Sequence, residues 1–241
     1  MEYKFKWLLP GAIAYLAIFF LAAPFSLYFI QKYYTPSTLV LITLAQSGLT
    51  VMLAFFLIFF CLLQKKETLQ MIWKNSHETS YFSDISWGIL GWLISFPIAS
   101  LINYLAEKMN YLLFGVPAAE QVGIRYLKMV AKSPGLLTIT LISILLFAPM
   151  MEELVFRGFL QTYLKQKLKF KWALILSSLI FAIFHFSFSQ GMQNFPLLLS
   201  LFSLSLFLGF LYEKQHSLVS PITLHMTFNL ITVIRILLLK D

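Results

Sequence analysis

Long apolar runs separated by short polar connections dominate this 241-residue chain. Each run approaches the roughly 20 apolar residues that cross a bilayer as one helix. We place seven of them, at residues 12–30, 39–63, 85–106, 136–151, 173–187, 195–212 and 218–239. The first run is too long for a signal peptide and lacks a small-residue cleavage site, so we expect it to stay as a span. The pattern predicts an all-α fold, a polytopic transmembrane helical bundle of about seven spans.

Polar residues within this pattern suggest two regions and one interfacial element. The connection at residues 107–132 interleaves apolar and charged side chains, which predicts an amphipathic helix at the membrane interface; an ordinary surface element fits equally well. Its apolar members are Ala118, Ala119, Val122, Tyr126, Leu127, Met129 and Val130. The first three spans contain almost no ionisable residue. We therefore interpret residues 1–133 as a transmembrane scaffold and residues 134–241 as a catalytic helical core.

Composition places the chain in the membrane class, with 59% hydrophobic and 12% charged residues. The formal net charge of +8 arises from short connections and not from a basic domain, so we expect the lipid bilayer as partner and no nucleic acid. Lys4, Lys6, Lys65, Lys66, Lys74, Lys165, Lys167, Lys169 and Lys171 would share one side of the membrane. The positive-inside rule then places the N-terminus in the cytoplasm, and we expect a bacterial inner membrane. Lys108, Arg125, Lys128 and Lys132 depart from this rule.

Two adjacent carboxylates, Glu152 and Glu153, interrupt an apolar run, and Arg157 follows. Residues four apart share a helix face, so Glu153 and Arg157 can pair, while Glu152 points about 100° away. Pairing leaves Glu152 as the less compensated carboxylate and a candidate general base. The alternative is that all three charges are solvated at the end of the fourth span. Pro149 removes a backbone donor nearby and can kink this helix.

Further polar groups occur on later helices. His185 follows Phe181 at spacing four, and His225 and Asn229 share one face of the last span. Each alone is compatible with packing, but a carboxylate, two imidazoles and a carboxamide at membrane depth each carry a burial cost unless paired. The complete set therefore points to a site.

Residue types favour hydrolysis by water. A carboxylate with a histidine can activate water, and His225 and Asn229 can donate hydrogen bonds to the oxyanion that forms at a carbonyl. Glu152, His185 and His225 are also the ligand types of a catalytic zinc site. No His-Glu-x-x-His sequence is present. The lone Cys61 excludes an intramolecular disulfide and lacks polar neighbours that would activate it.

Three ordered motifs resemble those of the CPBP (Abi) intramembrane proteases, a family related to the type II CAAX prenyl endopeptidases. They are Glu152-Glu153-x-x-x-Arg157, Phe181-x-x-x-His185 and His225-x-x-x-Asn229, and the resemblance covers roughly residues 136–234. It implies that Glu152 is the general base, that His185 helps to hold the water, and that His225 and Asn229 form the oxyanion hole. Glu153 and Arg157 would order the site. We favour a mechanism without a cofactor, with zinc as the open alternative.

The expected function is endopeptidase cleavage of a membrane-associated or lipidated peptide. A prenylated CAAX protein, a peptide leader, a bacteriocin-like precursor and a membrane-protein segment stay open as substrates. Two other classes are a proton- or ion-coupled transporter, in which the buried groups relay protons, and a non-catalytic bacteriocin self-immunity protein. The absence of an inverted repeat argues against the transporter.

Overall fold

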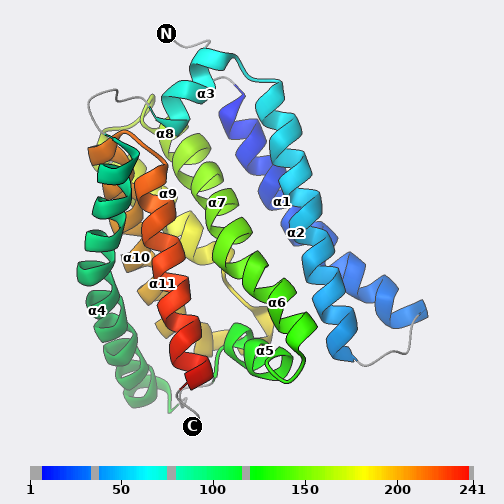
Figure 1. Ribbon diagram of the computed structural model, residues 1–241. Helices are drawn as coiled ribbons and strands as arrows, with labels where there is room; N and C mark the ends of the chain where they lie inside the picture. The colour runs from blue at the N-terminus through cyan, green and yellow to red at the C-terminus, as the bar shows by residue number, and fades with distance from the viewer. Residues whose placement is uncertain (1–6, 34–37, 75–79, 116–119, 239–241) are drawn as a thin grey trace.

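The computed structural model describes residues 7–33, 38–74, 80–115 and 120–238, and the elements in these ranges are all helical (Figure 1). The α-helices are α1 (Leu8–Tyr33), α2 (Thr38–Leu62), α3 (Lys66–Trp73), α4 (Tyr81–Phe114), α5 (Val122–Val130), α6 (Pro134–Ile142), α7 (Ala148–Glu153), α8 (Thr162–Leu164), α9 (Phe170–Phe184), α10 (Asn194–Gln215) and α11 (Val219–Leu238). Two π-helical segments, η2 (Ser143–Phe147) and η3 (Leu154–Gln161), and one 3₁₀ segment, η4 (Phe188–Gln193), complete the described elements.

Within the described ranges, seven apolar helical stretches match the seven predicted runs. Five are long and apolar enough to cross a membrane: Ala45–Leu62, Tyr81–Phe114, Pro134–Leu164, Gln190–Gln215 and Val219–Leu238. Leu8–Leu21 and Phe170–Phe184 are shorter apolar helices. The predicted polytopic helical bundle is confirmed, and the chain is an integral membrane protein.

The fourth apolar run continues further than its hydropathy indicates. We predicted a span at residues 136–151, but the helix runs without a break from Pro134 to Leu164. The charged side chains after Met151 ended the apolar run in the sequence without ending the helix. As a result, both glutamates and the arginine lie within the helix, and we call residues 134–164 the central helix.

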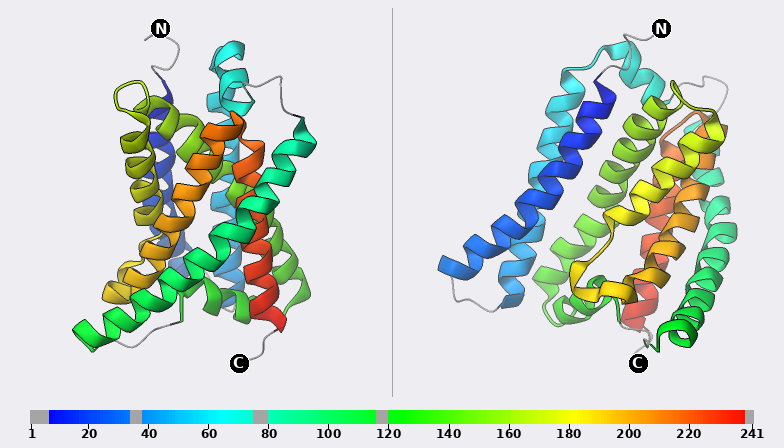
Figure 2. Two further views of the ribbon diagram at one scale, coloured as in Figure 1. Left: turned by 90° about the vertical axis from the view of Figure 1, so that its left-hand side faces the viewer. Right: turned by 180° about the vertical axis from the view of Figure 1, so that it is seen from behind.

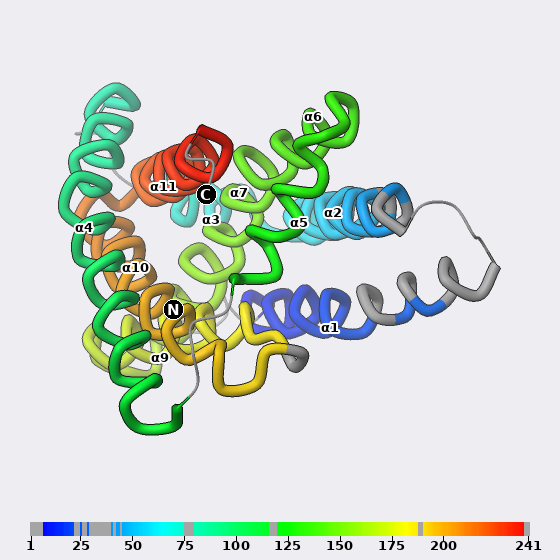
Figure 3. The backbone as a smooth tube through the Cα atoms, turned by 90° about the horizontal axis from the view of Figure 1, so that it is seen from below, coloured from blue at the N-terminus to red at the C-terminus, as the bar shows by residue number. Residues whose placement is uncertain are grey.

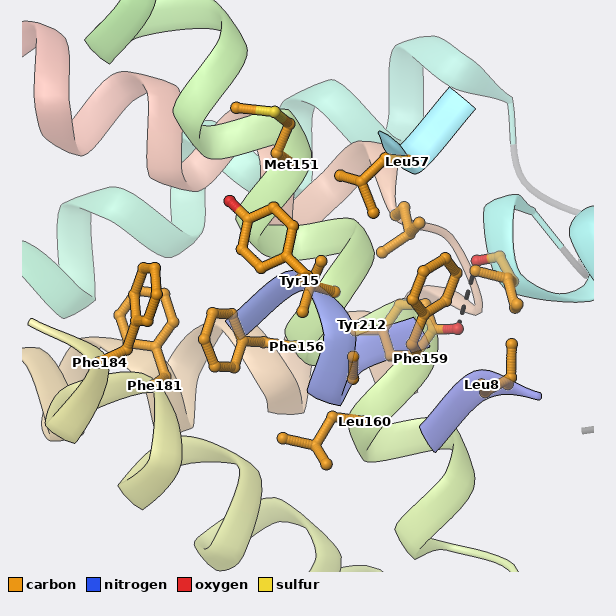
Figure 4. Packing of buried hydrophobic residues seen from close by; sticks show 14 of the residues in the cluster. Leu8, Tyr15, Leu57, Met151, Phe156, Phe159, Leu160, Phe181, Phe184 and Tyr212 are labelled. Atoms are coloured by element: carbon orange, nitrogen blue, oxygen red, sulfur yellow. Dashed lines mark hydrogen bonds between the residues drawn. The ribbon is translucent and has the colours of Figure 1, made fainter. Parts of the chain in front are cut away.

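The central helix separates two groups of helices. Seen from below, α1 and α2 lie on one side of it, whereas α4, α10 and α11 lie on the other (Figure 3). Helix α4 packs against α10 and α11, α9 packs against α10 and η3, and α1 packs against α2 and η3. The largest buried cluster joins Leu8, Leu57, Phe156, Phe159 and Tyr212, so the N-terminal helices and the central helix share one core (Figure 4). The predicted boundary at residue 133, between a scaffold and a catalytic core, therefore stays a prediction about function.

The lysine-rich connections gather at one end of the bundle. Helices α3 and α8, which adjoin Lys65 and Lys165, lie at the end where α1 begins, and α5 lies at the opposite end (Figure 1). There the Leu218 amide donates to the Trp73 carbonyl at 2.9 Å, which connects α3 to the start of α11. Lys4 and Lys6 lie outside the described residues, and the side of the membrane stays a prediction.

The expected amphipathic element is present as α5. Leu127 and Val130 are buried against Val233 of α11, whereas Met129 on the same helix is exposed. Lys128 on this helix forms an ion pair at 2.7 Å with Glu120, which lies just before the helix. Ala118 and Ala119, which we assigned to this element, lie outside the described residues. The helix therefore covers the end of the bundle with its apolar face.

Candidate active site

Glu153 and Arg157 form the predicted pair in the central helix. Arg157 Nη1 donates to Glu153 Oε1 at 3.2 Å, and Nε lies 3.1 Å from Oε2. Their exposed fractions are 0% and 1%, so the alternative of solvated charges at a helix end is wrong. Arg157 Nη2 also donates to the Ser205 carbonyl and hydroxyl, at 3.0 and 2.7 Å. Because a buried charge is costly unless paired and hydrogen-bonded, these contacts fix the guanidinium firmly in place.

His225 is oriented by the same carboxylate. Its Nδ1 lies 2.8 Å from Glu153 Oε1, although 72 residues separate the two along the chain. A carboxylate accepts hydrogen bonds, so Nδ1 carries the proton and Nε2 is directed elsewhere. That second nitrogen lies 4.0 Å from Glu152 Oε2. Glu153 therefore holds both Arg157 and His225, a second role that spacing alone did not reveal.

His185 approaches Glu152 from the end of α9. We placed it inside a span reaching residue 187, but α9 ends at Phe184 and His185 caps it. Its Nδ1 donates to the Phe181 carbonyl at 2.9 Å, so the spacing of four has a direct structural use. Its Nε2 lies 3.8 Å from Glu152 Oε2.

The early end of α9 is stabilised by Asn194, a residue that sequence reasoning missed. Its side chain accepts from the Ser187 amide at 2.9 Å and donates to the Ser187 and Gly191 carbonyls at 2.7 and 2.8 Å. Asn194 is buried, with 1% exposed. These bonds replace the helical hydrogen bonds that the chain gives up after Phe184, because buried backbone groups need partners. The available signal was the polar stretch at residues 187–194 inside an otherwise apolar sequence.

Glu152 lies where the two imidazoles converge. Its side chain is 12% exposed, and within the described part of the chain its buried Oε2 has no hydrogen-bond partner. The Nε2 atoms of both histidines, at 3.8 and 4.0 Å, are too distant for direct hydrogen bonds. Polar contacts of this length are suited to bridging by a water molecule. The two glutamates thus have different surroundings, as expected: Glu153 forms an ion pair, and Glu152 faces the histidines.

Asn229 is held by a carbonyl that Pro149 leaves free. In η2 the Ala148 amide donates to Ser143 five residues back, and the next amide in this register would donate to Ile144. That next residue is Pro149, which has no N–H. Asn229 Nδ2 supplies the missing donor and bonds the Ile144 carbonyl at 2.9 Å. One amide proton of Asn229 is used in this way, and its second is left for another acceptor.

A second polar contact between the central helix and α10 lies one turn beyond Arg157. Gln161 Nε2 donates to the Gly209 carbonyl at 3.0 Å, parallel to the Arg157–Ser205 contact. A Cβ at Gly209 would lie 2.5 Å from Gln161 Oε1, so only glycine permits this approach. The Arg157–Ser205 and Gln161–Gly209 contacts fix the register of the central helix against α10. Sequence reasoning missed Gln161 because nothing in its local pattern distinguishes it from a surface residue.

The zinc alternative can be compared with this geometry. Glu152, His185 and His225 have suitable donor types, and both imidazoles donate their other nitrogen as zinc-bound histidines usually do. However, no group of three or more histidine, cysteine or acidic side chains in the described ranges is arranged to hold a metal ion.

The C-terminal part of the chain matches a known protein family. Residues 134–231 match the family described as type II CAAX prenyl endopeptidase Rce1-like. We call this matching stretch the Rce1-like domain. The resemblance inferred from the three motifs is thereby confirmed, and this domain contains Glu152, His185, His225 and Asn229.

The chain is also similar to one individual protein. The chain is 27% identical over 169 residues to a Bacillus subtilis (strain 168) protein named "Putative membrane peptidase YdiL". The match covers 70% of this chain and 62% of that protein, so the chain spans less than two thirds of its relative. No solved structure matches the chain significantly. Together, these comparisons connect the Rce1-like domain with membrane peptidases.

Proposed function

We propose that this protein is an intramembrane endopeptidase that hydrolyses a peptide bond of a membrane-associated or lipidated peptide. The observation that carries the proposal is the convergence of His185 Nε2 and His225 Nε2 on the buried Oε2 of Glu152. A hydrolase needs a base beside a held water, and the second nitrogen of each imidazole is already engaged, which orients both rings. The Rce1-like match supports the same reaction class.

In the proposed mechanism, Glu152 accepts a proton from water while His185 Nε2 accepts the second hydrogen bond of that water. The water oxygen forms a bond to the carbonyl carbon, and the carbonyl oxygen becomes an oxyanion. The free amide proton of Asn229 donates to this oxygen. His225 contributes as an imidazolium, whose second proton on Nε2 donates to the oxyanion and whose charge Glu153 offsets. Glu152 then transfers its proton to the leaving nitrogen as the C–N bond breaks.

The short helix α9, which ends beside Glu152, supports a substrate that enters from the membrane. Helix α9 has 15 residues, and at 1.5 Å per residue it extends about 22 Å, less than the roughly 30 Å of a bilayer core. It ends at His185, and the chain continues past that level as a non-helical segment and η4 before α10 begins (Figure 2). We propose that the substrate segment enters beside this break, where α9 ends next to Glu152.

The proposal is tested with purified full-length protein in liposomes and two internally quenched peptides. One ends in a farnesylated CAAX sequence, and the other is the same peptide without the lipid. We expect wild-type protein to cleave at least one of them and E152Q to reduce kcat by at least about 10⁴-fold, as for loss of a central catalytic group. E213Q is the matched control, because Glu213 forms an ion pair with Lys165 near the surface.

Three outcomes would contradict the proposal. They are absence of cleavage of both peptides by the wild type, cleavage that persists in E152Q, and Glu152-dependent transport of an intact peptide. The last of these would instead favour the transporter alternative.

A further inference from the structure

One buried tyrosine beside the central helix comes from outside the Rce1-like domain. Tyr15 lies on α1 within Leu8–Leu21, a stretch that is otherwise entirely apolar. Only 2% of Tyr15 is exposed. A phenylalanine would fill the same volume without bringing a polar atom into the core, so the hydroxyl calls for an explanation.

The position of Tyr15 is set by packing beside the catalytic helices. Its ring centroid lies 6.3 Å from that of Phe184, the last residue of α9, and the centroid of the neighbouring His185 ring lies 5.5 Å from that of Phe184. Tyr15 also belongs to the buried cluster that contains Met151 and Phe156. Figure 4 shows its hydroxyl directed toward the central helix beside Met151, the residue immediately before Glu152.

Electrostatics connects this hydroxyl with the proposed base. The charge of the Glu152 carboxylate acts on the Tyr15 phenol, and no hydrogen bond from this hydroxyl to another described residue is present. Buried tyrosine hydroxyls normally have a partner. A phenol is neutral at pH 7 and can donate one hydrogen bond. The polar atom that most readily accepts it is one that enters the site with the substrate.

We propose that Tyr15 is a catalytic residue of the endopeptidase, whose hydroxyl donates a hydrogen bond to the substrate carbonyl oxygen as negative charge develops there. This inference rests on the proposed function and extends it to the N-terminal helices. It adds a neutral donor to an oxyanion site in which Asn229 has one proton committed to Ile144. The reaction is unchanged in its bonds and protons, because Tyr15 keeps its proton throughout.

The test compares Y15F with wild type on whichever quenched peptide is cleaved. Phenylalanine preserves the ring contact with Phe184, so we expect the melting temperature in detergent to be unchanged. We expect kcat to fall about 100-fold, as for loss of one oxyanion donor, with KM altered less than about threefold. The matched control is Y212F, because the Tyr212 hydroxyl bonds the Ile72 carbonyl instead of facing Glu152; its kcat should stay within about twofold.

A second measurement separates catalysis from packing. A peptide phosphinate, which mimics the tetrahedral intermediate, should bind Y15F more weakly than wild type by about the factor lost in kcat/KM. Wild-type kcat in Y15F, or unchanged phosphinate affinity, would overturn the role of Tyr15 and leave the endopeptidase proposal intact. A wild-type protein that cleaves neither peptide would overturn the endopeptidase proposal itself.

Discussion

The helix pair α1–α2 and the helices α9, α10 and α11 both contact the central helix, but they use different side chains. On the α1–α2 side the contacts are apolar, as in the 5.3 Å approach of the Phe60 and Phe159 rings. On the other side they include Arg157–Ser205, Gln161–Gly209 and Glu153–His225. Apolar packing tolerates small shifts, whereas hydrogen bonds fix register and direction. The site is therefore positioned by the polar side and enclosed by the apolar one.

Removal of the Arg157 charge should have the largest effect on the polar side of the central helix. R157M leaves the Glu153 carboxylate buried without its cation, so we expect the free energy of unfolding to fall by about 3–5 kcal/mol. Equilibrium unfolding in mixed micelles measures this change. Catalysis should fall as well, because Glu153 also orients His225.

A double variant separates these two effects. E153L/R157M replaces the buried pair with apolar side chains, which should restore most of the lost stability. It should not restore cleavage, because His225 would still lack the acceptor for its Nδ1 proton. Full activity in the double variant would show that the Glu153–His225 contact has no catalytic importance.

Substitution of one glycine in α1 and one in α2 tests the apolar side of the central helix. A Cβ at Gly11 would collide with the Phe60 ring, whereas a Cβ at Gly48 would meet no atom within 4 Å. G11A should therefore destabilise the protein by about 1–3 kcal/mol, the usual cost of overpacking, and G48A should not. Thermal unfolding of both variants in the same detergent checks this. Equal melting temperatures would mean that α1 and α2 separate at no cost.

Local rules predicted those parts of the site that depend on spacing within one helix. The Glu153–Arg157 pair followed from residues four apart, and the direction of Glu152 followed from the same helix geometry. His225 could be named as a site residue but not paired with Glu153, because that contact depends on how α11 packs against α7. The bond from Asn229 to Ile144 likewise required both Pro149 and the π register of η2.

Hydropathy predicted the number of apolar helices better than their ends. The central helix continues past its apolar run because Arg157 and Gln161 find partners on α10, which makes polar side chains compatible with burial. Helix α9 ends early because Asn194 bonds the chain that follows. In both cases a tertiary hydrogen bond decided the boundary, and such bonds are not visible in a hydropathy pattern.

The central claim is that Glu152 activates water and does not attack the substrate itself. Single-turnover cleavage of a quenched peptide in ¹⁸O-water, with mass spectrometry of the new carboxyl end, tests it most directly. The account predicts one ¹⁸O atom in the product of the first turnover, because the attacking oxygen comes from water. A first-turnover product without ¹⁸O, with label appearing later on Glu152, would contradict it, since the carboxylate would then be the nucleophile.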